Sequence, residues 1–162
     1  MKPYIRLMFL TFFLLTLSSC SDSSQPPSTP TLVPSRYSRI GDSAEKMEPA
    51  GDHHPPVLHS PDWEEPVPMP GPINTAGGED SPFITPDGKM FYFFFTPDVS
   101  IPAEKQLTDS VTGIYQSSLI DGSWSEPERV ILFDDLALDG CPMALGNQLW
   151  FCSARTGYEG IN

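Results

Sequence analysis

The pattern of apolar and polar residues divides the chain into a short apolar leader, a polar stretch and a region of β-strands. An uncharged apolar run covers residues 7–17, and residues 21–60 are rich in serine and proline with neither helical nor strand periodicity. From residue 61 onward, short segments rich in aromatic and β-branched residues alternate with turn residues. This alternation is typical of an all-β fold.

The clearest pair of predicted strands covers residues 81–85 and 89–95. Pro-Asp-Gly at 86–88 separates them, and in such a turn proline sets φ while glycine accepts a left-handed backbone. The second strand contains five consecutive aromatic residues, so it is apolar on both faces. Because a strand with one solvated face alternates apolar and polar residues, we expect both faces of this strand to be covered.

Two further strands are predicted at residues 114–119 and from residue 124 to residue 130. Asp-Gly at 121–122 separates them, which is a preferred two-residue hairpin turn. The four strands together have the pattern of one antiparallel blade of a β-propeller.

The landmarks of this region recur in the same order. Residues 63–66 recur at 124–127, 79–82 at 139–142, 88–93 at 146–151, and 113–115 at 160–162, with shifts of 61, 60, 58 and 47 residues. Self-similarity on this scale indicates a repeat architecture such as a solenoid or a propeller.

The repeat resembles the WD-like propeller repeat of TolB-type proteins over residues 63–162. The resemblance depends on Ser-Pro at 81–82, Pro-Asp-Gly at 86–88 followed by Lys-Met-Phe-Tyr-Phe, Gly-Ile-Tyr at 113–115 and Asp-Gly-Ser-Trp at 121–124. The second unit departs from it, since Ala-Leu-Gly replaces the Pro-Asp-Gly turn at 144–146. The resemblance implies a propeller, but that family includes scaffolds, peptidase propellers and many uncharacterised lipoproteins, so it does not specify a function.

We expect this propeller to be incomplete, with about one full blade plus parts of its neighbours. The last landmark, at 160–162, corresponds to the beginning of a third strand in its blade. Two blades cannot close a ring, and four or more are usual. The prediction is therefore a fragment or a truncated reading frame, in which residues 61–162 form a partial propeller.

The leader resembles the signal peptide of bacterial lipoproteins. Lys2 and Arg6 precede the apolar run, which is too short for a permanent membrane span, and Leu-Ser-Ser-Cys at 17–20 is similar to a lipobox. The resemblance implies removal of residues 1–19, lipidation of Cys20 and anchoring in the cell envelope, outside the cytoplasm. Ser21 after the cysteine favours the outer membrane. Residues 20–60 are then a flexible, disordered tether.

Net charge narrows the range of partners. The chain has 9 basic and 21 acidic residues, and loss of Lys2 and Arg6 with the leader makes the net charge about −14. Such a surface repels nucleic acid and anionic lipid headgroups, so the expected contact with the membrane is through lipid on Cys20.

Acidic residues at the predicted blade starts are the candidate binding residues. Glu79, Asp80 and Asp139 precede the first strands of the two units, where a propeller places residues near its central axis. The long loop over 96–112 emerges on the same face, and long loops on a rigid frame often carry function. In five-bladed glycosidases such acids catalyse hydrolysis, whereas acids repeated in successive units also fit a structural or channel-lining role.

The remaining chemistry is sparse. Asp52, His53, His54 and His59 could ligate zinc or copper, but they lie in the proline-rich tether and adjacent histidines rarely share one ion, so we predict neither a metal nor another cofactor. The sequence contains no legible Ser/His/Asp set, glycine-rich phosphate loop or paired CxxC motif.

Cys141 and Cys152 are a candidate disulfide. If residues 141–152 form a hairpin with a two-residue loop at 146–147, the two cysteines lie directly opposite each other, within the usual range of disulfide Cα separations. An exported protein can keep such a bond. The alternative is two buried free thiols that pack as small apolar groups.

These observations predict a membrane-tethered, extracytoplasmic lipoprotein whose propeller binds an envelope protein or glycan without catalysis. The alternative is a carbohydrate-active enzyme, similar to a glycoside hydrolase, that uses channel-facing carboxylates such as Asp80.

Overall fold

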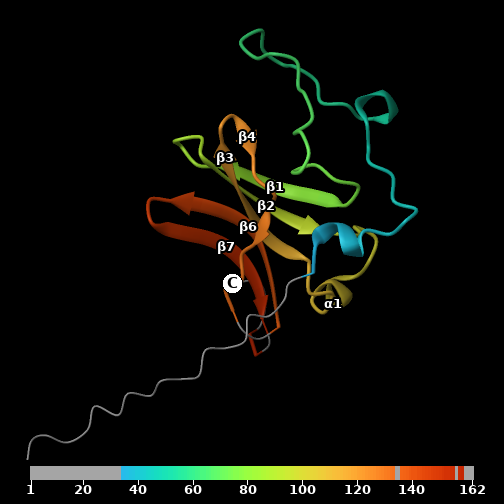
Figure 1. The fold of residues 1–162 in the computed structure, drawn as a ribbon, viewed down its shortest axis with the longest axis vertical. Coiled ribbons are helices and arrows are strands. Elements are labelled where there is room, and N and C mark those ends of the chain that lie inside the picture. The colour runs from blue at the N-terminus through green and yellow to red at the C-terminus, as the bar shows by residue number, and fades with distance from the viewer. Residues whose placement is uncertain (1–33, 134–135, 156, 159–162) are drawn as a thin grey trace, which may run out of the picture. The chain divides into compact units, whose positions relative to one another are not determined.

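The chain folds as antiparallel β-structure with very little helix, so the all-β prediction is confirmed (Figure 1). The computed structural model describes residues 34–133, 136–155 and 157–158. Within these residues the helical elements are single turns, namely the 3-10 helices η1 (Arg36–Arg39) and η2 (Pro49–Gly51) and the helix α1 (Ala103–Gln106). No described helix is long and apolar enough to cross a bilayer. The leader and Cys20 lie outside the described residues.

The first sheet is an antiparallel meander. Its strands are β1 (Gly78–Ile84), β2 (Met90–Thr96), β3 (Gly113–Ile120) and two short segments, β4 (Ser123–Trp124) and β5 (Glu128–Arg129). β1 pairs with β2, β2 with β3, and both short segments pair with β3. This order agrees with the predicted four-strand unit except in the last strand.

The expected fourth strand, from residue 124 to residue 130, is interrupted rather than continuous. β4 ends at Trp124, and pairing with β3 resumes only at Glu128. Pro127 in the gap has no N–H to donate to a ladder. Ser125 is bonded to β3 irregularly, because its N–H donates to the Ser118 carbonyl at 2.9 Å while its hydroxyl, rather than its carbonyl, accepts from the Ser118 N–H at 3.0 Å. Proline and local hydroxyl bonding therefore divide the strand in two.

Both predicted turns of the first unit are present. Between β1 and β2, the Gly88 N–H donates to the Thr85 carbonyl at 2.8 Å, and Gly88 has φ +70°. The Asp87 carboxylate accepts hydrogen bonds from the Thr85 hydroxyl and the Lys89 N–H, and these bonds lower its pKa. At the second turn, Asp121 and Gly122 both have positive φ, as a two-residue hairpin loop requires.

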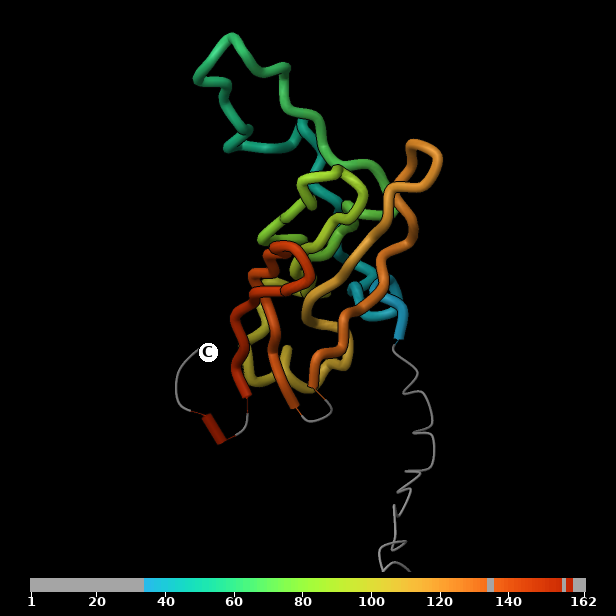
Figure 2. The backbone as a smooth tube through the Cα atoms, turned by 90° about the vertical axis from the view of Figure 1, so that its left-hand side faces the viewer, coloured from blue at the N-terminus to red at the C-terminus, as the bar shows by residue number. Residues whose placement is uncertain are grey.

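A second antiparallel pair, β6 (Ala137–Leu145) and β7 (Gln148–Arg155), lies against the first sheet (Figures 1 and 2). The predicted two-residue loop is present, because Leu145 pairs with Gln148 across Gly146 and Asn147. β6 contacts β1, β2 and β3. The approach is close at Gly140, where a Cβ atom would lie 3.2 Å from the Phe94 ring, so the absence of a side chain lets the two layers meet.

The two units repeat an irregularity as well as a sequence. In β1 the register shifts between Asp80 and Phe83, so that Ser81 and Pro82 stand against one residue of β2. In β6 it shifts in the same way between Gly140 and Met143, at Cys141 and Pro142. Ser81 and Cys141 both have φ +52°, a left-handed conformation at the bulge that is uncommon outside glycine. The 60-residue shift between these positions is therefore a true structural equivalence.

The core lies on one face of the first sheet and is mostly aromatic. Its buried members are Ile73, Phe91, Phe93, Phe95, Val111 and Tyr115. The Tyr115 hydroxyl donates to the Val111 carbonyl at 2.7 Å, and burial raises the pKa of Tyr115 to about 12. The expectation that both faces of this strand are covered is confirmed for one face, where Phe91, Phe93 and Phe95 are buried. Tyr92 and Phe94 on the other face are only half-buried.

Arg36 extends this core into the segment expected to be a free tether. Its side chain is 2 % exposed, and its guanidinium carbon lies 5.4, 5.1 and 5.4 Å from the ring centroids of Phe93, Phe95 and Tyr115. Its Nη2 donates to the Pro72 carbonyl at 2.5 Å, and its Nη1 lies 3.6 Å from the Glu79 carboxylate. The chain around Arg36 is therefore docked on the sheet, which differs from the expectation of a disordered tether up to residue 60.

The packed β-domain does not begin at the expected boundary of residue 61. Trp63, matched in the sequence to Trp124, is 74 % exposed, whereas Trp124 packs against the aromatic core. The first strand begins only at Gly78. The Trp-x-Glu-Pro landmark is thus repeated in sequence without being repeated in packing.

Replacing Arg36 should destabilise the protein more than replacing its exposed neighbour Arg39. We expect Arg36→Ala to lower the free energy of unfolding by about 3 kcal/mol, because it removes the stacked guanidinium and leaves Glu79 without its cation. Arg36→Lys should lower it by about 1–2 kcal/mol, since an ammonium keeps the charge but cannot stack as a plane. Arg39→Ala should change it by less than about 0.5 kcal/mol. Urea denaturation followed by tryptophan fluorescence measures these differences, and equal midpoints for Arg36→Ala and Arg39→Ala would contradict the assignment.

Candidate functional site

A cavity of about 200 Å³ lies where the two repeat units meet. Strands β1 and β2 contribute residues from one unit, and β6 and β7 contribute residues from the other. The lining residues are Asp80, Ser81, Phe94, Leu138, Gly140, Cys141, Cys152, Ser153 and Ala154. The cavity combines an aromatic ring, a carboxylate, two hydroxyls and two thiols, so it has groups for polar and apolar recognition.

Contact between the two bulges forms part of this cavity. The Ser81 Oγ donates to the Cys141 Sγ at 3.7 Å, so equivalent residues of the two units touch each other. The positive φ at both positions turns each chain out of regular strand geometry. The shared Ser/Cys-Pro pair was visible in the sequence, but the contact between the two copies was not.

Asp80 is the one predicted acid that lines the cavity. It is exposed, and its Oδ1 accepts a hydrogen bond from the Ser81 N–H at 2.6 Å. It is also the only carboxylate among the residues that line the cavity. Hydrolysis of a glycoside by acid and base requires two carboxyl groups that flank the bond, and this cavity supplies one from the described residues.

Glu79 has a structural environment instead. Its Oε1 accepts hydrogen bonds from the Thr75 hydroxyl at 2.5 Å and the Thr75 N–H at 3.2 Å, and Arg36 lies 3.6 Å away. The carboxylate therefore caps the turn that leads into β1 and offsets the buried charge of Arg36. The sequence suggested a structural role for the repeated acids, and the contacts of Glu79 agree with it.

Asp139, the counterpart of Glu79 in the second unit, also pairs with an arginine. It is 7 % exposed, accepts a hydrogen bond from the Ser153 hydroxyl at 2.5 Å, and lies 3.6 Å from the Arg155 Nη2. Arg155 Nε donates to the same Ser153 hydroxyl at 2.7 Å, and its guanidinium carbon lies 4.6 Å from the Phe133 ring centroid. The three predicted acids are therefore divided, with Asp80 at the cavity and Glu79 and Asp139 each beside an arginine.

Sequence reasoning missed both arginines. Arg155 lies two residues after Ser153 on β7, so strand periodicity places both side chains on one face and could have indicated their contact. Arg36 has no comparable signal, because it lies in a Ser/Pro-rich segment about 40 residues before its partner Glu79. Only the tertiary fold brings it to the aromatic core.

The register expected for the two cysteines is wrong by one position. Leu145–Gln148, Ala144–Leu149 and Met143–Trp150 pair as predicted, but the bulge then places Gly140, not Cys141, opposite Cys152. Both cysteines are exposed free thiols, which differs from the buried alternative as well. They still lie close together, because Cys141 follows the Gly140 that pairs with Cys152 and both cysteines line one cavity. As a result, the charge of Cys141 is the main cause that raises the pKa of Cys152. The disulfide remains a prediction.

The long loop between β2 and β3, which was expected to carry function, packs in part against the core. It contains α1, and Val111 and Thr112 near its end are buried. Asp109 accepts hydrogen bonds from the N–H groups of both residues, at 2.8 and 2.7 Å. Much of this loop therefore closes the end of the core.

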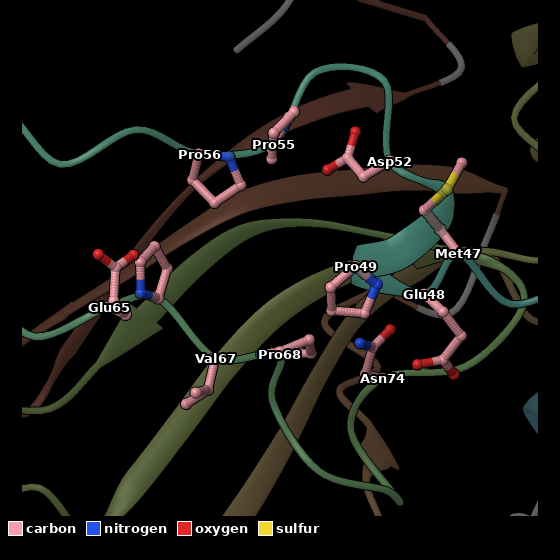
Figure 3. A pocket seen from close by; sticks show the side chains of 11 residues that line it. Met47, Glu48, Pro49, Asp52, Pro55, Pro56, Glu65, Val67, Pro68 and Asn74 are labelled. Carbon is pink, nitrogen blue, oxygen red and sulfur yellow. The ribbon is translucent and has the colours of Figure 1, made fainter.

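The histidine-containing segment adjoins a separate cavity of about 330 Å³ with many proline rings (Figure 3). Asp52 lines it and accepts a hydrogen bond from the His54 N–H at 2.8 Å, so this carboxylate stabilises a local turn. His53, His54 and His59 are exposed. Within the part of the chain that the structure describes, no three His, Cys, Asp or Glu side chains come together as metal ligands.

Comparison with known proteins adds no relative. No protein-family model, curated protein sequence or solved structure matches this chain. The site must therefore be interpreted from its own geometry.

Removing Cys141 should make Cys152 ionise more easily. The pKa of Cys152 is raised mainly by the charge on Cys141, so Cys141→Ser should lower it toward the ordinary value of a cysteine. The pH dependence of iodoacetamide alkylation, measured in a Cys20→Ser background, reports this pKa. Ala154→Ser, which changes another lining residue, serves as the control and should leave the pKa in place. An unchanged alkylation profile in Cys141→Ser would contradict the proposed coupling.

Proposed function

We propose that this protein is a membrane-tethered, extracytoplasmic binding module built from propeller-type repeats. The observation that carries the proposal is the contact between Ser81 and Cys141, which are equivalent residues of successive units. In a propeller, blades are related by rotation about a central channel, so equivalent inner-strand residues of neighbouring blades approach one another. The packing of β6 across β1, β2 and β3 also agrees with one blade covering the face of the next.

Exposed apolar side chains on the hairpin of β6 and β7 support packing of this unit against another blade or a bound partner. Met143, Leu145 and Trp150 are 44, 61 and 56 % exposed. Such a group of large apolar residues is uncommon on a strand pair that faces only water. Packing by another blade or by a bound partner would remove this surface from solvent.

The contacts of Glu79, Asp80 and Asp139 favour binding over catalysis. Glu79 and Asp139 pair with Arg36 and Arg155 and use their oxygens for structural hydrogen bonds. Asp80 remains available beside the Phe94 ring in the inter-repeat cavity. One carboxylate beside an aromatic ring suits recognition of a hydroxyl-rich glycan or a polar protein loop from the cell envelope.

The envelope location depends on the sequence alone. The basic start, the apolar run and Leu-Ser-Ser-Cys at 17–20 support export followed by lipid attachment at Cys20, and Ser21 favours the outer membrane. The docked segment around Arg36 leaves about 15 residues between Cys20 and the sheet, which is enough extended chain to bridge a headgroup layer.

A glycoside hydrolase remains the second candidate because Asp80 is an exposed carboxylate in a cavity. This alternative requires a second carboxyl group about 5–9.5 Å away across the substrate. A hydrolase would release reducing sugar from its substrate, whereas a binding module would not.

The lipid anchor can be tested by metabolic labelling with an alkyne fatty acid in a bacterial host. The parent chain should incorporate label and partition into the membrane fraction, whereas Cys20→Ala should do neither, because the acceptor sulfur is missing. Ser21→Ala retains the cysteine and should label like the parent. Equal labelling of the parent and Cys20→Ala would remove the anchor from the proposal.

The site can be tested with a panel of immobilised envelope glycans and purified envelope proteins. We expect binding without release of reducing sugar, and an affinity about tenfold lower for Asp80→Asn, because one charged hydrogen-bond acceptor is lost. Asp62→Asn, which changes an exposed acid outside the cavity, should bind like the parent. Sugar release that Asp80→Asn abolishes would instead establish the hydrolase.

A further inference from the structure

The two thiols of the inter-repeat cavity form a chemical group that the proposed binding role does not use. Cys141 and Cys152 are exposed, unbonded to each other, and line the same cavity. Cys141 lies in the bulge of β6, and Cys152 lies on the neighbouring strand β7. A ligand that enters the cavity can therefore meet both sulfurs at once.

The bulge determines how these sulfurs are presented. Cys152 stands opposite Gly140, so no side chain across the ladder blocks it, and Cys141 is the next residue along β6. Cys141 has φ +52° and its Sγ lies 3.7 Å from the Ser81 Oγ. The backbone therefore positions two thiols side by side at the junction of the units.

The electrostatics of the pair disfavour two free thiolates and favour a shared cation. Cys141 and Cys152 line one cavity, so two thiolates formed there would repel each other. The Asp80 carboxylate in the same cavity adds negative charge. A cation bound by both sulfurs would replace this repulsion with attraction.

The ligand set restricts which cation can bind. Zinc in structural sites takes four ligands and in catalytic sites three from the protein, and no third His, Cys, Asp or Glu joins the pair among the described residues. Calcium and magnesium require several oxygen ligands. Thiolate sulfur selects soft metals, of which monovalent copper and silver accept two sulfurs in a linear arrangement.

We propose that Cys141 and Cys152 form a two-sulfur site for a soft monovalent metal ion, of the Cu(I) or Ag(I) class, at the junction of the repeat units. On binding, two S–H bonds break and two metal–sulfur bonds form. Two protons pass to solvent, and no electron is transferred. Binding of the ion requires neither the lipid nor a glycan, but the ion would share its cavity with Asp80 and Phe94.

The test uses Ag(I), which is redox-inert under these conditions and needs no added reductant. The full chain carrying Cys20→Ser is purified in mild detergent and chloride-free buffer, so that the pair supplies the only thiols. Native mass spectrometry should then show one silver ion gained with two protons lost. One equivalent of silver should protect both thiols from alkylation, and affinity should rise with pH because binding releases protons.

Single-sulfur variants make the measurement specific. Cys141→Ser and Cys152→Ser should each bind silver at least about 100-fold more weakly than the parent, because the second sulfur no longer binds intramolecularly. Asp62→Asn, which changes an exposed residue outside the cavity, should bind like the parent. Far-ultraviolet circular dichroism of each variant confirms that the strands are retained.

Three results would overturn the proposal. Single-cysteine variants that bind as tightly as the parent would show that the sulfurs act separately. Two silver ions per chain would show the same. Thiols that resist alkylation in the metal-free protein but react after reduction would establish the disulfide in place of the metal site.

Discussion

A single buried charge, the Arg36 guanidinium, connects the parts of the first unit. It stacks among Phe93 and Phe95 of β2 and Tyr115 of β3, and it pairs with Glu79 of β1. Among the described residues, the Arg36 Nε has no hydrogen-bond partner. A buried cation requires groups that offset its charge, and here carbonyls, carboxylates and aromatic faces do so together. The aromatic core, the turn into β1 and the segment before the sheet therefore depend on one another.

The need to offset the charge of Arg36 explains the structural role of Glu79. It also explains why the three predicted acids have different surroundings. The carboxylate nearest the buried arginine becomes a structural group, and Asp139 takes the same part beside Arg155 in the second unit. Asp80 has no such partner among the described residues and remains exposed at the cavity. Adjacent residues on one strand thus have different roles, because alternate side chains point to opposite faces.

The bulges determine what lies between the units. A left-handed conformation at a residue other than glycine costs about 1–3 kcal/mol, and it persists when the surrounding structure holds it. Ser81 and Cys141 both adopt it before a proline, within matched strand pairs. Their contact brings the thiols, the Phe94 ring and Asp80 to one cavity. The same irregularity therefore supports the repeat interpretation, the binding proposal and the proposed metal site.

Local patterns in the sequence determined the all-β class, the turns at 86–88, 121–122 and 146–147, and most of the strands, because each depends on neighbouring residues. The repeat predicted Glu79 and Asp139 as equivalents, and their surroundings agree. Three features were decided only by the tertiary structure: the docking of Arg36, the interruption at Pro127 and the one-residue shift beside Cys152. A pairing register depends on every residue between the turn and the position of interest, so one bulge moves all later partners. Likewise, a buried arginine is defined by rings and carboxylates distant in the chain, and no local pattern in the sequence specifies them.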